Sequence, residues 1–278
     1  MNGILLIDKK ENKSTTFIDM IVKKRIGTSK VGHAGTLDPF ATGLVICGVN
    51  KGTKILSYLE NASKEYLATL KLGVKTNTLD REGEVLERRE VKKHNKEEIE
   101  EVLRSFLGKI KQVPPMYSAL KVNGVPLYKL ARKDVEIERK EREVEIYDIK
   151  LISYENDEIT FLTHVSKGTY IRTLGEDIAY RLGELGHLVS LRRTRVGRFN
   201  VEDSKDVDLI SCDDIVRIKD AVEFKTVEVD AKIEKLVRNG HKIKLPCEEK
   251  VVLLISKSGE ELALYGYEDG LYKCLRGL

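Results

Sequence analysis

Asp38 is the acidic residue whose neighbours best suit it to chemistry. It stands in KVGHAGTLDPFATGLVICGVNKGTK, residues 30–54, with three glycines close by and Pro39 directly after it. Because proline lacks an N–H and disfavours helical geometry in the preceding residue, Asp38 is expected on a loop or in an extended segment. The apolar run at 44–49 predicts a buried strand after this loop. Such a setting suits a catalytic carboxylate, although an ordinary polar turn fits the pattern equally well.

Three further residues could assist that carboxylate. If the fold brings Arg172 to Asp38, the ion pair would keep the aspartate ionised. An ionised aspartate without a second carboxylate suits nucleophilic or base chemistry better than acid catalysis. Tyr66 and Tyr170 offer flat faces for a nucleobase and hydroxyls for proton handling. An isolated tyrosine is nevertheless more often a structural residue.

The segment HLVSLRRTRVGRF, residues 187–199, is a local positive patch with four arginines and no acid. Such a patch suits phosphate groups, whereas a charged strand edge that blocks further pairing is the alternative interpretation. The absence of acidic residues from this segment favours contact with nucleic acid over a charged strand edge. His33 could stack on a displaced base, although a lone histidine is more often structural. The four arginines are Arg192, Arg193, Arg195 and Arg198.

Composition and missing motifs exclude several classes of protein. The chain has 278 residues, 41% of them hydrophobic, and a net charge of +4, so a core is expected and the total charge alone indicates no partner. Four scattered cysteines without a CxxC pair suit a reducing compartment, and five histidines without ligand spacing predict no metal. Neither GxGxxG nor a Walker A motif occurs, so no nucleotide cofactor is expected. The lack of a signal peptide and of a membrane-length apolar run predicts a cytoplasmic protein.

The elements around these residues are predicted as a mixture of strands and helices. Ser14 predicts the start of a helix over 15–25, and Asn95 predicts the start of another that ends at Gly108. Because strands and helices do not alternate strictly, we expect an α+β fold rather than a doubly wound sheet. Strands are predicted at 3–8, 44–49, 64–72, 85–91, 144–154 and 158–166.

The segment QVPPMYSALKVNGVPLYKLAR, residues 112–132, combines several local signals. Its two prolines exclude a helix at 114–115. A strand is predicted at 118–122, followed by a type I′ turn at Asn123–Gly124 and a short helix at 127–132. The prolines and basic residues make 112–135 a candidate for a mobile lid.

A domain boundary is expected between about 200 and 224, where the chain is highly charged. The last ~55 residues hold short strands separated by glycines, which indicates a small β-rich module. The sequence therefore predicts a large domain at 1–224 and a small one at 225–278.

Four motifs in this order resemble the bacterial tRNA pseudouridine synthase B family over nearly the whole chain. The resemblance implies isomerisation of the uridine at position 55 in the tRNA T loop, with no cofactor because no atoms are gained or lost. It also implies a catalytic domain with a mixed, mainly antiparallel bent sheet flanked by helices, followed by an RNA-binding PUA domain. The motifs are KVGHAGTLDPFATG (30–43), KEYLATLKLGVKTNTLDREG (64–83), QVPPMYSALKVNGVPLYKLAR (112–132), and VSKGTYIRTLGEDIAYRLG with LRRTRVGRF (165–199).

The resemblance assigns roles to individual residues. Asp38 matches the catalytic aspartate, which would attack C1′ of the ribose or assist elimination to a glycal. His33 matches the histidine that fills the gap left by the flipped nucleotide, and Tyr66 matches the tyrosine that stacks on the target base. Three others match residues of the same pocket: Tyr170, Arg172 and Leu191.

Two positions depart from the family pattern. The first motif reads Asp8-Lys9-Lys10 where proline usually stands third, and Ala34 replaces the usual threonine before GTLDP. As partner we expect the T stem-loop of tRNA, recognised by folded shape and phosphate contacts, with no protein partner and a monomeric chain. A non-catalytic RNA-binding module and a guide-RNA-dependent homologue remain open as alternatives. A metal or glycoside hydrolase is disfavoured because no second carboxylate accompanies Asp38.

Overall fold

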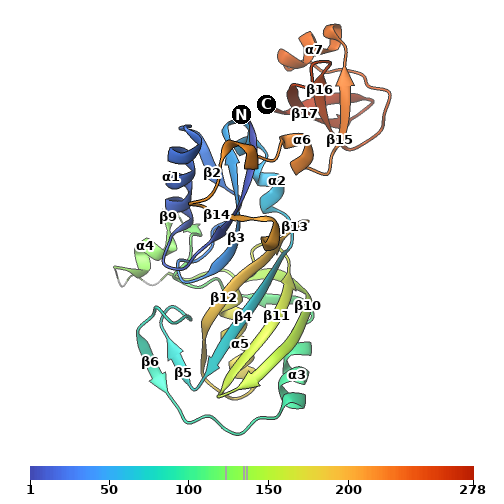
Figure 1. Cartoon of the computed structure of the whole chain (residues 1–278). Helices are drawn as coiled ribbons and strands as arrows, with labels where there is room; N and C mark the ends of the chain where they lie inside the picture. Colours follow the sequence, from blue (N-terminus) through green and yellow to red (C-terminus); the bar gives the residue numbers. More distant parts are fainter. Residues whose placement is uncertain (123, 134, 136) are drawn as a thin grey trace.

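The computed structural model describes residues 1–122, 124–133, 135 and 137–278. Figure 1 shows a large unit built on one long sheet and a smaller unit that lies close to both chain ends. Within the described residues, every helix is too short or too polar to cross a membrane.

The described part of the large unit contains a ten-stranded sheet with the order β14-β1-β3-β12-β4-β11-β10-β7, to which β13 adds beside β12 and β2 beside β3. Two pairs of neighbouring strands, β1 with β14 and β3 with β12, are parallel, and the others are antiparallel. The predicted mixed, mainly antiparallel sheet is therefore confirmed. The strands are β1 (Gly3–Lys9), β2 (Val31–His33), β3 (Thr42–Val49), β4 (Lys64–Leu72), β7 (Gly108–Gln112), β10 (Arg142–Glu155), β11 (Glu158–Val165), β12 (Gly186–Val196), β13 (Phe199–Asn200) and β14 (Lys205–Asp206).

The parallel contact between β3 and β12 determines where the site can form. It joins Thr42 to Arg192 and Gly43 to Arg193. Gly43 has φ +103°, and a Cβ there would stand 2.3 Å from the Arg193 carbonyl oxygen. Only glycine permits this approach. The loop that precedes β3 and carries Asp38 is thereby held against β12.

Helices α1, α3 and α5 bury side chains in the same core as β4 and β11. The cap of α1 agrees with the prediction, since the Ser14 hydroxyl accepts from Phe17 N and Gly27 ends the helix with φ +70°. Helix α3 ends earlier than predicted. The Ser105 hydroxyl donates to the Val102 carbonyl, and the predicted end residue Gly108 begins β7 instead. The helices are α1 (Thr15–Ile26), α2 (Leu56–Glu60), α3 (Lys96–Arg104), α4 (Leu127–Ala131), α5 (Ile171–Arg181), α6 (Ile218–Ala221) and α7 (Ala231–Arg238); 3-10 turns are η1 (Asn50–Lys54), η2 (Val201–Asp203) and η3 (Cys212–Asp214).

Two small hairpins lie outside the main sheet. β5 (Val74–Thr76) pairs with β6 (Val85–Arg88), which is shorter than the predicted strand at 85–91. β8 (Lys121–Val122) pairs with β9 (Val125–Pro126), so the predicted hairpin is present, although its first strand is shorter than 118–122. The predicted turn type depends on Asn123, which lies outside the described residues.

The C-terminal unit contains a four-stranded sheet with the order β15-β16-β17-β18. Its own core includes Val229, Val252 and Tyr265. A second cluster joins Leu253 and Leu264 of this unit to residues of β1 and β3, so the two units pack together. Sequence patterns predicted the last three strands but missed β15 and α7. The strands are β15 (Lys225–Val229), β16 (Val251–Ser256), β17 (Glu261–Glu268) and β18 (Leu271–Gly277).

Candidate active site

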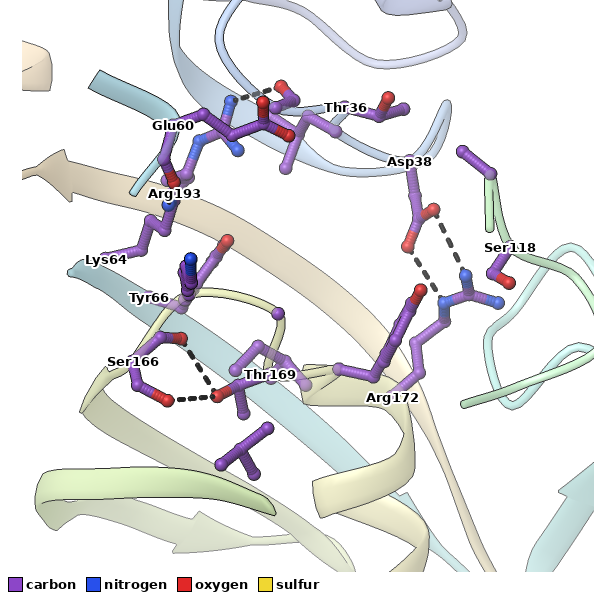
Figure 2. A pocket seen from close by; sticks show the side chains of 18 of the residues that line it. Thr36, Asp38, Glu60, Lys64, Tyr66, Ser118, Ser166, Thr169, Arg172 and Arg193 are labelled. Atoms are coloured by element: carbon purple, nitrogen blue, oxygen red, sulfur yellow. Dashed lines mark hydrogen bonds and ion pairs between the residues drawn. The ribbon is translucent and has the colours of Figure 1, made fainter. Parts of the chain in front are cut away.

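A cavity of about 810 Å³ opens beside the Asp38 loop. Its walls come from elements far apart in the sequence: the loop before β3, strands β4 and β12, the start of α5, and the segment around Ser118. Six of the predicted site residues line it together: Asp38, Tyr66, Tyr170, Arg172, Leu191 and Arg193. Figure 2 shows Asp38 and Arg172 pointing toward each other, and Tyr66 across the view from this pair, near the side chains of Lys64 and Arg193.

Asp38 and Arg172 form an ion pair with two contacts. Arg172 Nε lies 2.8 Å from Asp38 Oδ2, and Nη2 lies 3.1 Å from Oδ1. The Arg172 side chain is 4% exposed, whereas that of Asp38 is 32% exposed. The arginine is therefore a fixed, buried support, and the carboxylate remains accessible from the cavity. Bidentate pairing of this kind fixes the carboxylate plane as well as its charge.

Asp80 is a member of the site that sequence reasoning missed. Its Oδ2 lies 3.5 Å from Arg172 Nη1, on a buried side chain. Burial raises the pKa of Asp80 above its ordinary value, while the Thr78 hydroxyl and the Arg172 charge oppose the shift. In the sequence this residue belongs to TNTLDREG, which indicates only a turn. Its proximity to Arg172 depends on the fold, which places that turn beside the start of α5.

Two main-chain acceptors complete the environment of Arg172. Its Nη1 donates to the Thr78 carbonyl at 2.8 Å, and its Nη2 donates to the Tyr117 carbonyl at 2.7 Å. The guanidinium is thus held by two carboxylates and two carbonyls from three separate segments. A buried guanidinium with this many partners has little freedom to turn away from Asp38.

One wall of the cavity is formed by Tyr66 on β4 and Leu191 on β12. Both side chains are buried against the sheet and line the cavity. Tyr170 stands directly before α5, and its backbone is fixed by Gln112: Tyr170 N donates to Oε1 at 3.0 Å, and Nε2 donates to the Tyr170 carbonyl at 3.3 Å. An aromatic ring and an apolar side chain on the same wall of a cavity could receive a planar base.

His33 is not among the residues that line this cavity. Its Nδ1 lies 2.7 Å from Oδ2 of Asp19 on α1, and it belongs to β2. A structural role for this contact fits the geometry. The proposed function of His33 in filling the gap left by a flipped nucleotide stays a prediction.

The predicted arginine patch is not an unbalanced positive charge. Arg192 binds both carboxylate oxygens of Asp8 at 3.0 and 2.9 Å, and Arg195 lies 3.3 Å from Glu65. Acids are missing only within the segment itself, because these carboxylates come from other strands, β1 and β4. The expected contact with nucleic acid stays a prediction, whereas the alternative of a strand edge was wrong, since β12 lies between β3 and β4.

Arg193 and Arg198 differ from the other two arginines. Arg193 is only 1% exposed, and its Nε donates to the Leu44 carbonyl at 2.7 Å, so the prediction of a phosphate contact does not fit it. The Arg198 guanidinium lies 5.0 Å from the centre of the Phe199 ring and donates to the Asp220 carbonyl. Phosphate contacts of Arg192, Arg195 and Arg198 stay predictions.

Two buried lysines lie near the site, and sequence reasoning missed the role of both. Lys9 Nζ donates to the carbonyls of Lys10, Lys13 and Pro39, and burial lowers its pKa to about 8, partly offset by Asp38. Lys64 lines the cavity and donates to the carbonyls of Glu60 and Ala62; burial lowers its pKa to about 8 as well. Lys9 thus holds the peptide that follows Asp38. The described residues include no cluster of three or more His, Cys, Asp or Glu suited to a metal ion.

Comparison with known proteins agrees with this geometry. The family model described as TruB family pseudouridylate synthase (N terminal domain) matches residues 23–171, and the model for the tRNA pseudouridylate synthase B C-terminal domain matches residues 172–239. Fold and site together define a pseudouridine synthase, which is an isomerase. More narrowly, the chain belongs to the TruB family.

Relatives and solved structures support the same placement. The chain is 37% identical over 281 residues to tRNA pseudouridine synthase B of Mesoplasma florum, covering 99% of this chain and 98% of that one. It is 43% identical over 249 residues to tRNA pseudouridine synthase B of Clostridium kluyveri, covering 88% and 86% of the two chains. A chain in the structure of an H/ACA ribonucleoprotein bound to a substrate RNA containing 2′-deoxyuridine shares the fold, with TM-score 0.73, 22% identity, and coverage of 99% and 84%.

Proposed function

We propose that this chain converts the uridine at position 55 of the tRNA T loop to pseudouridine. The observation that carries the proposal is the Asp38–Arg172 pair, with a buried guanidinium that orients an accessible carboxylate at a cavity faced by Tyr66. The names of the relatives in Mesoplasma florum and Clostridium kluyveri support tRNA as substrate.

The reaction breaks the C1′–N1 glycosidic bond, turns the uracil, and joins C5 to C1′. Asp38 is the group that meets the ribose, either by attack at C1′ or by assisting elimination to a glycal. Arg172 keeps its carboxylate oriented throughout. Because no atoms are gained or lost, the chain's own residues suffice and no cofactor is proposed.

The target base must leave its stack before Asp38 can reach the sugar. Unstacking costs a few kcal/mol, which stacking on an aromatic ring in the pocket can offset with roughly 1–3 kcal/mol. Tyr66 supplies that ring, and Leu191 and Tyr170 enclose the base from neighbouring elements. His33 is proposed to enter the gap that the base leaves in the RNA.

Domain organisation and partners belong to the same proposal. Residues 1–224 form the catalytic domain, and the sheet unit at 225–278 is a PUA-like module that contacts RNA. Arg192, Arg195 and Arg198 contact the RNA backbone. The chain acts as a cytoplasmic monomer on the T stem-loop without a protein partner or a guide RNA.

The test is a hairpin of T-arm sequence incubated with the purified chain alone, followed by chemical mapping of pseudouridine. A matched hairpin carries cytidine in place of the target uridine. The proposal expects a single modified position in the first RNA and none in the second. No turnover by the isolated chain would contradict it and favour the guide-dependent or non-catalytic alternative.

A further inference from the structure

The peptide directly before Asp38 is held by one side chain, that of Thr15. Thr15 Oγ1 accepts a hydrogen bond from Leu37 N at 3.0 Å and donates one to the Leu37 carbonyl at 3.1 Å. A hydroxyl has one donor hydrogen and two acceptor lone pairs, so it can satisfy both groups at once. Thr15 is 2% exposed and Leu37 is 3% exposed, so water has almost no access to replace these bonds.

The Thr15 hydroxyl has no role in capping its own helix. Thr15 is the first residue of α1, and the cap is supplied by the preceding residue, Ser14, whose hydroxyl accepts from Phe17 N. Thr15 Oγ1 instead forms hydrogen bonds with both main-chain groups of Leu37, 22 positions further along the chain. Its polar group therefore acts on the Asp38 loop and not on the helix.

Other side chains hold the loop on both sides of this contact. Arg193 Nη2 lies 3.5 Å from the Gly35 carbonyl, and Lys9 Nζ donates to the Pro39 carbonyl at 2.9 Å. Gly35, Leu37 and Pro39 are thus bonded to side chains of β12, α1 and β1, respectively. Thr15 holds the residue nearest to Asp38 on its N-terminal side.

We propose that Thr15 is a positioning residue that sets the orientation of the Asp38 carboxylate by clamping the Leu37 peptide. The proposal rests on the proposed function, because its main readout is isomerisation of tRNA uridine. Without the clamp the Leu37 N–H and carbonyl are buried and unpaired, and the loop shifts to find partners. The carboxylate then meets the ribose at the wrong angle, which slows the chemical step and leaves RNA affinity unchanged.

The test compares Thr15→Val with Thr15→Ser. Valine keeps the shape of the side chain and removes the hydroxyl, whereas serine keeps the hydroxyl. In the valine variant the single-turnover rate should fall on the order of ten- to a hundredfold, while the dissociation constant for RNA stays unchanged. In the serine variant the rate should be close to that of wild type. Thr53→Val is the control, since the half-buried Thr53 hydroxyl donates to the Asn50 carbonyl at 2.7 Å and Thr53 does not line the cavity. The rate of this control variant should not change.

Hydrogen exchange separates the clamp from the catalytic assignment. Amide exchange in a peptide covering residues 35–41 should be faster in Thr15→Val than in wild type or Thr15→Ser, whatever the activity. Unchanged exchange would overturn the clamp. Faster amide exchange in Thr15→Val together with a wild-type rate of isomerisation would overturn the positioning role of Thr15. An inactive wild-type chain would refute the proposed function, and the exchange result would still decide the clamp.

Discussion

Arg172 meets Asp38 through two contacts, from Nε to Oδ2 at 2.8 Å and from Nη2 to Oδ1 at 3.1 Å. The guanidinium is itself fixed by the carbonyls of Thr78 and Tyr117. The carboxylate plane is therefore set before any RNA arrives. Preorganisation of this kind lowers the barrier without a rearrangement during the reaction.

Replacing Arg172 by lysine should slow isomerisation by roughly a hundredfold or more, because an ammonium keeps the charge but cannot make both contacts or reach both carbonyls. The single-turnover rate measures this effect, and filter binding should show unchanged RNA affinity. Arg181→Lys on the same helix is the control, since Arg181 is exposed, its guanidinium lies over the Phe106 ring, and it does not line the cavity. Equal losses in both variants would contradict a specific role for Arg172.

Replacing Asp80 by asparagine should reduce the rate by about tenfold, because the neutral amide no longer holds Nη1 of Arg172 by charge. The shape and the contact with the Thr78 hydroxyl can persist, so folding should survive. Burial raises the pKa of Asp80, so we expect its ionised form to be disfavoured by folding. The variant should therefore unfold at the same temperature or a higher one. A wild-type rate would contradict the role of Asp80 in holding Arg172.

Two substitutions at Tyr66 test whether its ring stacks on the target base. Tyr66→Phe keeps the flat ring and should retain most of the rate, whereas Tyr66→Leu loses stacking worth roughly 1–3 kcal/mol and should be slower by about tenfold or more. Single-turnover rates on the T-arm hairpin measure both. If the phenylalanine variant is as slow as the leucine variant, the hydroxyl takes part in proton transfer and the ring alone does not explain the role of Tyr66.

Asp177 should make stability depend on pH below neutrality. Burial raises its pKa from 3.8 to about 6, with Glu176 adding to the shift and Arg181 opposing it. Between these values the folded protein binds a proton that the unfolded chain has released. The stability gained from this group is therefore complete below pH about 4 and lost as pH rises through about 6.

Thermal unfolding of Asp177→Asn checks that sign. The variant should melt at a higher temperature than wild type at pH 7, and the difference should vanish near pH 4. Asp213→Asn is the control, since Asp213 is exposed and its melting temperature should follow wild type at both pH values. A variant that is less stable at pH 7 would show that Asp177 is ionised and favourably paired in the fold.

Local signals in the sequence predicted the elements that carry the site but not every contact between them. Alternation predicted β4 with Tyr66, and Ser14 and Gly27 predicted both ends of α1. Asp38 and Arg172 are 134 positions apart, and their pairing was expected from a family resemblance together with charge. The roles of Asp80, Thr15 and Lys9 depend on contacts across the fold, which no spacing in the sequence encodes.

The arginines of β12 also show that the sequence could not predict contacts between distant segments. No acid stands within their segment, so the sequence indicated a free positive patch. Asp8 and Glu65 neutralise two of them from neighbouring strands, and Arg193 is buried beneath the Asp38 loop. Charge balance is a property of the folded surface, and local composition could not predict it.

The most direct test of the account is the Asp38→Asn variant on a T-arm hairpin, with product mapping and RNA binding measured on the same samples. Asparagine preserves the size of the side chain and removes the charge that Arg172 orients. The account predicts no pseudouridine after prolonged incubation, with RNA affinity close to that of wild type. Continued turnover by this variant would contradict it.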